Sequence, residues 1–165
     1  MKNYLIDYTA YMRQLAAEHV RLHHTPDEPH FFRGELEEFM DGLRSKVNFP
    51  CLVTESNEVE YEGTKNNLSK KRSTSFIIVD TYDNVGDFNE TDEKMSLCEM
   101  IAEDILGRML TDTQKPFRMA QVEEAEGNYL VHESERYVGY RVNLTMIEPN
   151  ICLTNNTVWT KNDQD

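Results

Sequence analysis

The sequence predicts an α+β fold, in which a mainly antiparallel sheet of about six strands is packed by an N-terminal helix pair and one long central helix. Two observations support this prediction. Apolar residues recur at helical spacing near the N-terminus and again in residues 91–110, whereas residues 75–82 and 136–146 have the patterns of buried and half-buried strands. Strands that follow one another in runs between helices favour an α+β arrangement over a parallel, doubly wound one.

The N-terminal helix pair is predicted from two apolar stripes. In residues 3–24 the stripe consists of Leu5, Tyr8, Met12, Leu15, His19 and Leu22. Thr25-Pro26 ends this helix, because a residue before proline is biased away from helix. The second stripe consists of Phe32, Leu36, Phe39, Met40, Leu43 and Val47. Gly34 and Gly42 weaken the second helix, since glycine costs about 1 kcal/mol in a helix interior.

The spacing changes to that of strands after residue 50. Residues 51–55 and 58–62 flank Ser56-Asn57, which predicts a hairpin. Residues 63–73 are then expected to form a polar loop that carries four cations. These are Lys65, Lys70, Lys71 and Arg72. Residues 75–82 are apolar on both faces through their middle, which predicts a central strand.

The best-patterned helix is predicted in residues 91–110. Its apolar stripe consists of Met95, Cys98, Ile101, Ala102, Ile105 and Met109, and N-cap chemistry is offered by Asn89, Thr91 and Asp92. Three strands are expected after Pro116, in residues 117–123, 128–132 and 136–146, with turns at 126–128 and 133–135. Residues 1–150 are expected to form one domain, and residues 151–165 a polar C-terminal tail.

The charge balance is strongly acidic. The chain of 165 residues has 30 acidic and 17 basic residues, for a formal net charge of -13. No specific nucleic-acid binding is expected, because affinity for phosphates comes mostly from Lys and Arg. The sequence has no run near the ~18 apolar residues of a membrane span, and it does not begin like a signal peptide, so a cytoplasmic protein is expected.

The histidines are the first candidate for chemistry. His19 and His23 lie at i and i+4 on the predicted first helix, with His24 and His30 nearby, and such a pair can hold a metal. However, His19 falls on the apolar stripe, His23 lies off its edge, and no HExxH-type partner accompanies them. We therefore expect no metal here.

Asp80 is the second candidate, as the metal-binding acid of a nuclease-like site. Its companions would be Asp83 with Glu55 or Glu60. The neighbouring runs offer no Glu-x-Lys or Asp-x-Lys spacing, and alternating Glu58, Glu60 and Glu62 are typical of the solvent face of an edge strand. Since phosphate-binding glycine motifs, GxSxG and CxxC are also absent from the sequence, neither an enzyme nor a cofactor is expected.

The order of these elements resembles that of phage tail terminator proteins and their relatives in contractile injection systems. The matching features are the opening helix in residues 3–24, the strands in 49–82, the crossing helix in 91–110 and the closing strand in 136–146. The resemblance rests on order and pattern, and the family has no diagnostic motif whose residues could be carried over. The second N-terminal helix and the polar tail depart from the simplest version of that plan.

The resemblance implies a structural protein that forms a ring, often a hexamer, which caps the tail tube and joins it to a connector. Such a protein would be incorporated in a virion or tail particle. An acidic lumen would repel the DNA that passes through it, and Lys65, Lys70, Lys71 and Arg72 would contact the tube protein or a neighbouring subunit. The alternative is a small, monomeric, acidic interaction protein, such as an immunity protein or a nucleic-acid-mimicking inhibitor, that binds a basic partner.

Overall fold

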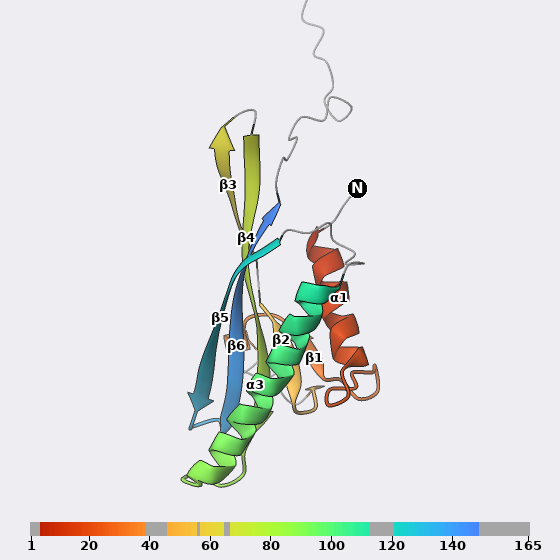
Figure 1. Ribbon diagram of the computed structural model, residues 1–165. Helices are drawn as coiled ribbons and strands as arrows, with labels where there is room; N and C mark the ends of the chain where they lie inside the picture. The colour runs from red at the N-terminus through yellow and green to blue at the C-terminus, as the bar shows by residue number, and fades with distance from the viewer. Residues whose placement is uncertain (1–3, 39–45, 56, 65–66, 113–120, 149–165) are drawn as a thin grey trace, which may run out of the picture.

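The fold is organised around the 15-residue strand β4 (Asn67–Thr81), in which Phe76, Ile77, Ile78 and Val79 are buried in succession. A strand that is apolar on both faces belongs inside a sheet, and the central position predicted for residues 75–82 is confirmed. The computed structural model describes residues 4–38, 46–55, 57–64, 67–112 and 121–148. Figure 1 shows β4 running the length of the sheet.

The described residues contain a mixed sheet of six strands. They are β1 (Phe31–Arg33), β2 (Cys51–Thr54), β3 (Glu58–Thr64), β4, β5 (Gln121–His132) and β6 (Tyr137–Glu148). Their order is β1-β2-β4-β6-β5, and β3 also pairs with β4. β1 is parallel to β2, and the other pairings are antiparallel. The predicted α+β class is confirmed, and the sheet differs from the expected one by its parallel pair.

β2 and β3 follow one another along the same side of β4. Thr54 in β2 is opposite Phe76, and Glu58 in β3 is opposite Ser73. The hairpin predicted at Ser56-Asn57 is therefore wrong, because the two strands that flank this dipeptide both pair with β4 and not with each other. The chain instead reverses between Thr64 and Asn67, which form the last pair of the β3–β4 ladder.

The polar loop predicted for residues 63–73 is also wrong. Apart from residues 65 and 66, which lie outside the described residues, this segment belongs to β3 and β4. Its polar side chains do not prevent it from forming a strand, because the backbone groups of residues 70–73 bond to two neighbours: β3 on one side and β6 on the other. Side-chain hydrophobicity is not needed where the ladder satisfies the backbone.

Two long helices, α1 (Tyr4–Glu18) and α3 (Phe88–Thr111), lie on one face of the sheet (Figure 1). Both confirm a predicted helix, although α1 ends at Glu18, well before the predicted end at Thr25-Pro26, and α3 begins earlier than expected. Its N-cap is Asp87, whose side chain accepts hydrogen bonds from the backbone of Asn89 and Glu90. The core beneath the helices joins Tyr8, Met12, Leu15, Ile101 and Ile105 to Leu52, Phe76, Ile78, Val142 and Leu144. Each such side chain stabilises the fold by roughly 1.5–3 kcal/mol.

The second helix of the predicted N-terminal pair is wrong in its first half. Phe31–Arg33 is strand β1, and α2 (Leu36–Glu38) is a single turn; residues 39–45 lie outside the described residues. Gly34 separates these elements, and a Cβ there would lie 2.8 Å from the Phe32 ring. The apolar residues of this segment cover the other face of the sheet. Phe32, Leu36, Val47 and Phe49 pack against Cys51, Val53, Ile77, Val79 and Tyr137.

β5 and β6 form a long antiparallel hairpin. The two strands predicted in residues 117–123 and 128–132, and the turn predicted at 126–128, are replaced by the continuous strand β5; residues 113–120 and the tail at 151–165 lie outside the described residues. Gly127 does not make a turn. It accommodates the ring of Tyr140, whose hydroxyl a Cβ at this position would approach to 2.0 Å. The turn predicted at 133–135 is confirmed.

Candidate functional site

The most distinctive part of the molecule is the hairpin arm, which we define as β3 together with residues 67–73 of β4. The arm projects beyond the ends of both helices (Figure 1). All seven residues of β3 are exposed, as alternating Glu58, Glu60 and Glu62 predict for an edge strand. Residues 70–73 of the arm also pair with β6, so only its tip, residues 62–64 and 67–69, is a two-stranded ribbon. Such a ribbon is only marginally stable in water by itself, so the tip depends on its continuation into the sheet through β4.

The four predicted contact residues do not form one cluster. Lys65 lies outside the described residues, and the other three lie in succession on β4. Successive side chains of a strand point to opposite faces. Because Phe76 and Ile78 face the helices, Lys70 and Arg72 share that face, whereas Lys71 points to the opposite one.

The helix-side face of the arm is cationic and aromatic. Lys70 lies opposite Tyr61, and its Nζ is 5.7 Å from the centre of the Tyr61 ring, within the range of a cation–π contact. The Tyr61 side chain is 53% exposed. Arg72 is only 7% exposed, so of the two cations on this face Lys70 is the one available to a partner.

The open face of the arm is acidic, and it leads into a hollow of about 440 Å³ on the sheet. Lys71 faces three glutamates there, at positions 58, 60 and 62 of the neighbouring strand. The hollow has five carboxylates: Glu35, Glu55, Glu58, Glu124 and Glu126. Ser73, Ser75, Asn143 and Thr145 also line it. The two faces of one sheet therefore differ in charge.

One glutamate of the hollow is held in place by two contacts. Arg141 Nη2 donates to Glu55 Oε1 at 2.7 Å, and the Ser75 hydroxyl donates to Glu55 Oε2. The side chain of Glu55 is 10% exposed, so this ion pair compensates a carboxylate that is largely removed from water. The other four carboxylates of the hollow keep its surface negative.

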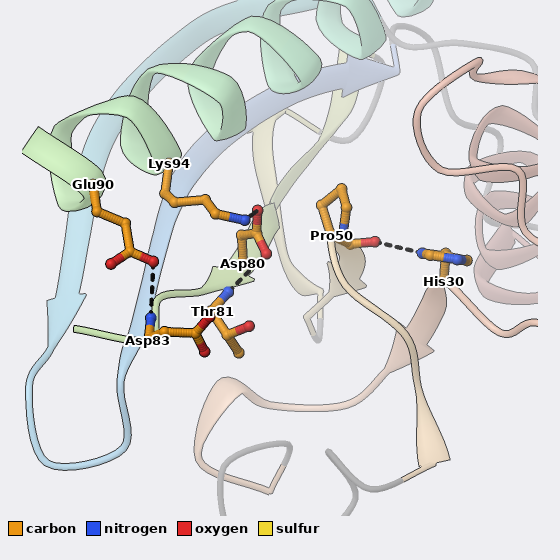
Figure 2. A network of polar contacts seen from close by, with 7 residues as sticks. All are labelled: His30, Pro50, Asp80, Thr81, Asp83, Glu90 and Lys94. Carbon is orange, nitrogen blue, oxygen red and sulfur yellow. Dashed lines mark hydrogen bonds and ion pairs between the residues drawn. The ribbon is translucent and has the colours of Figure 1, made fainter.

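Asp80, the candidate acid of a nuclease-like site, pairs with a lysine of α3. Lys94 Nζ lies 3.0 Å from Asp80 Oδ2, and Asp80 Oδ1 accepts the backbone N–H of Thr81 (Figure 2). Its predicted companion Glu55 does not lie beside it, because Glu55 bonds to Ser75. Ser75 is five residues from Asp80 along β4, which corresponds to roughly 17 Å at about 3.3 Å per residue. The described residues bring together no three His, Cys, Asp or Glu side chains that could hold a metal.

The candidate histidines make contacts within the fold. His19 Nε2 lies 3.3 Å from Asp104 Oδ2, and His30 Nδ1 lies 2.7 Å from the carbonyl oxygen of Pro50 (Figure 2). His24 Nδ1 accepts the backbone N–H of His30 at 3.1 Å. Burial, followed by the charges of Arg13 and His30, lowers the pKa of His24. His19 and His23 lie beyond the end of α1 and not on it as predicted. The contact of His19 reaches α3, whereas those of His24 and His30 lie beside β1 and β2.

The thiols of Cys51 and Cys98 are free and buried. Burial raises the pKa of both, to about 12 for Cys98. Since the thiolate is the reactive form, neither thiol is an effective nucleophile at neutral pH. Cys152 lies outside the described residues.

The acidic hollow was not predicted from the sequence. Its glutamates come from the residue before α2, from the break between β2 and β3, from the start of β3, and from β5. Only the pairing of β3 with β4, of β4 with β6, and of β6 with β5 brings Glu58 and Glu126 to one face. The clustered acidic residues in 123–126 can be seen in the sequence. The sequence does not show which strands lie beside them, so it does not predict the hollow.

Comparison with known proteins gives no relative: the scan of family models finds no match for this chain, and neither does the search of curated proteins. Within the described residues, no helix has both the length and the apolar content that crossing a membrane requires.

Proposed function

We propose that this chain is a non-enzymatic structural subunit that assembles with copies of itself into a ring, which caps or joins the tube of a phage-like tail or contractile injection apparatus. The observation that carries the proposal is the hairpin arm, whose helix-side face is cationic and aromatic while its open face continues into the acidic hollow. Surfaces of opposite charge on the two sides of one sheet can bind each other only between different molecules.

Such a contact joins two different surfaces of identical subunits, so it is heterologous. Repeated heterologous contacts generate a ring when the rotation between neighbours closes. In the proposed contact, the helix-side face of one arm, with Tyr61 and Lys70, lies on the acidic open face of the next subunit. The lysine then faces glutamates of the neighbour, and Tyr61 supplies the apolar area that an interface needs at its centre.

The net charge of -13 fits a role beside DNA. A tube or connector that conducts DNA functions best if its wall does not bind phosphates, and a surface rich in carboxylates repels them. The proposed partners are therefore further copies of this chain, with six as the expected number in a ring, and a tail-tube or connector protein. The proposed location is the cytoplasm or the assembled particle.

Sedimentation of Lys70→Ser and Lys71→Ser tests the contact with a control on the same strand. Both variants lose one positive charge from adjacent positions of β4, but their side chains lie on opposite faces. Lys70→Ser is expected to weaken assembly, most strongly at low salt, because screening already reduces the attraction in the wild type at high salt. Lys71→Ser should assemble at least as well as the wild type, since it removes a cation from the acidic face.

The complementary variant removes charge from the receiving surface. Glu124→Gln combined with Glu126→Gln should weaken assembly to a similar extent as Lys70→Ser, and the triple variant should be little worse than either, because both sets of changes remove the same contact. Equal behaviour of Lys70→Ser and Lys71→Ser, or no assembly of the wild type even with tube protein, would contradict the proposal.

The acidic hollow favours a second candidate function, that of a small interaction or inhibitor protein with a basic partner. Five glutamates around a concave polar surface fit a protrusion that carries Lys or Arg. A protein of this kind stays monomeric alone and binds one basic protein. The Glu124→Gln, Glu126→Gln variant should then lose that partner, while Lys70→Ser should keep it, which separates the two functions.

A further inference from the structure

β5 forms the free edge of the sheet opposite to β1, and its two halves differ in how that edge is protected. In the first half, a bulge lies between Val122 and Glu124, and Glu126 adds a further charge. Bulges and charged side chains are the usual devices that prevent an edge strand from pairing with another chain. In the described residues β5 pairs only with β6, so its outer backbone groups face no other strand.

The second half of β5 has none of these devices. Residues 128–132, Asn-Tyr-Leu-Val-His, carry no Asp, Glu, Lys, Arg or Pro, and their pairing with β6 is regular. Tyr129 and Val131 are about half exposed, and because they are two residues apart they lie on the same face. Phe88, which is 80% exposed, begins α3 at the same end of the molecule (Figure 1).

We propose that this half of β5 pairs with the same segment of a second copy of this chain, antiparallel and about a two-fold axis at Leu130. The sequence of the segment is self-complementary in that register. Leu130 would lie opposite Leu130, and Tyr129 opposite Val131 of the other copy, an aromatic–β-branched pair of the kind that stabilises antiparallel strands. The contact joins two identical surfaces, so it stops at a dimer.

Charge is the reason why a second copy would bind here and not elsewhere. A chain with a net charge of -13 repels itself over most of its surface, and residues 128–132 form an uncharged gap in that surface when His132 is neutral. The nearest fixed charges are on α3. Glu99 accepts the Tyr129 hydroxyl at 2.5 Å, and Glu103 lies close enough to contribute to the raised pKa of Tyr129.

These glutamates give the dimer a characteristic dependence on salt. Pairing brings Glu99 and Glu103 of both copies to the same face of the joined sheet, and their repulsion opposes it. Added salt screens that repulsion and leaves the strand pairing and the apolar contacts intact. The dimer should therefore become stronger with salt, whereas the proposed contact between the hairpin arm and the acidic hollow should become weaker. The failure of one proposal can thus be told from the failure of the other.

Sedimentation velocity of the full chain, over a range of protein and salt concentrations, tests the dimer. Val131→Glu places a charge at the centre of the pairing, and Val20→Glu is the matched control at an exposed position outside β5 and the hairpin arm. Val131→Glu is expected to weaken dimerisation by about tenfold or more, and Val20→Glu should leave it unchanged. Val131→Ser is a milder second variant, in case the glutamate disturbs the fold.

Amide hydrogen exchange of the wild type gives an independent result that needs no variant. Amides of residues 128–132 should exchange more slowly at high than at low protein concentration, while amides of β1, at the opposite edge of the sheet, should not change. A monomer under all conditions would overturn the proposal, as would equal effects of Val131→Glu and Val20→Glu. An assembly that salt only weakens would likewise overturn it, and would assign the contact to the hairpin arm.

Discussion

Replacing Lys94 with methionine is expected to lower the free energy of unfolding by about 3 kcal/mol. Lys94 Nζ is 3.0 Å from Asp80 Oδ2, and the side chain of Asp80 is 4% exposed, so methionine removes the cation that faces a buried carboxylate. Breaking one side of a buried pair costs about 3–5 kcal/mol. The low end applies because the Lys94 side chain is 35% exposed and water already screens part of the attraction.

Urea unfolding followed by circular dichroism measures this loss, and thermal unfolding should show a melting temperature lower by roughly 6–12 °C. Asp80→Asn keeps an acceptor for the Thr81 N–H without the charge, so it should cost only about 1 kcal/mol. The double variant should then be more stable than Lys94→Met alone. If Lys94→Met unfolds within about 1 kcal/mol of the wild type, or if the two changes are additive, the pair does not hold α3 on the sheet.

Three further predictions concern the core, the histidines and a glycine. Ile101→Asp should prevent folding, because it buries an unpaired charge beneath α3, whereas Leu110→Asp, at an exposed position of the same helix, should melt close to the wild type; circular dichroism compares them. Stability should fall as the pH drops below about 6.5, because the lowered pKa of His24 means that the unfolded chain binds more protons than the folded one in that range. Urea unfolding at several pH values should show that the free energy of unfolding of His24→Asn depends less steeply on pH than that of the wild type. Gly127→Ala should cost about 1–3 kcal/mol through its clash with Tyr140, and most of that cost should disappear in a Tyr140→Ala background, as urea unfolding can measure.

The periodic segments of the sequence were sufficient to predict the main helices and the central strand. The spacing of apolar residues directly indicates the burial of Ile101 and Ile105 on α3 and of Phe76 to Val79 on β4. The segments that were predicted wrongly are those whose side chains do not indicate which strands pair. Lys70 and Lys71 look like loop residues, but their backbone lies between two strands. Phe32, a residue of the predicted second helix, lies in strand β1, and the apolar residues of that segment pack against the face of the sheet opposite to the two long helices.

The candidate site could be predicted only in part, because it depends on which strands are neighbours. The acidity of the chain and the cations of β4 can be read from the sequence, but their separation onto two faces cannot. This separation follows from the alternation of side chains along β4, which places Lys70 and Lys71 on opposite faces. A loop, which the sequence predicts for this segment, has no such alternation. Glu126 enters the hollow for a similar reason, since its position follows from the register of β5 on β6.

The continuity of β4 has a consequence for how the hairpin arm would bind. A flexible loop must be ordered when it meets its partner, and that ordering reduces affinity. The arm is instead an extension of the strand that carries Phe76 and Ile78 in the core, so its direction is set when the domain folds. A preorganised arm loses little entropy on binding, and it holds its partner at one angle. The geometry of any assembly built on this arm would then be encoded in the twist of the sheet, and the arm would discriminate by shape against partners that a loop could adapt to.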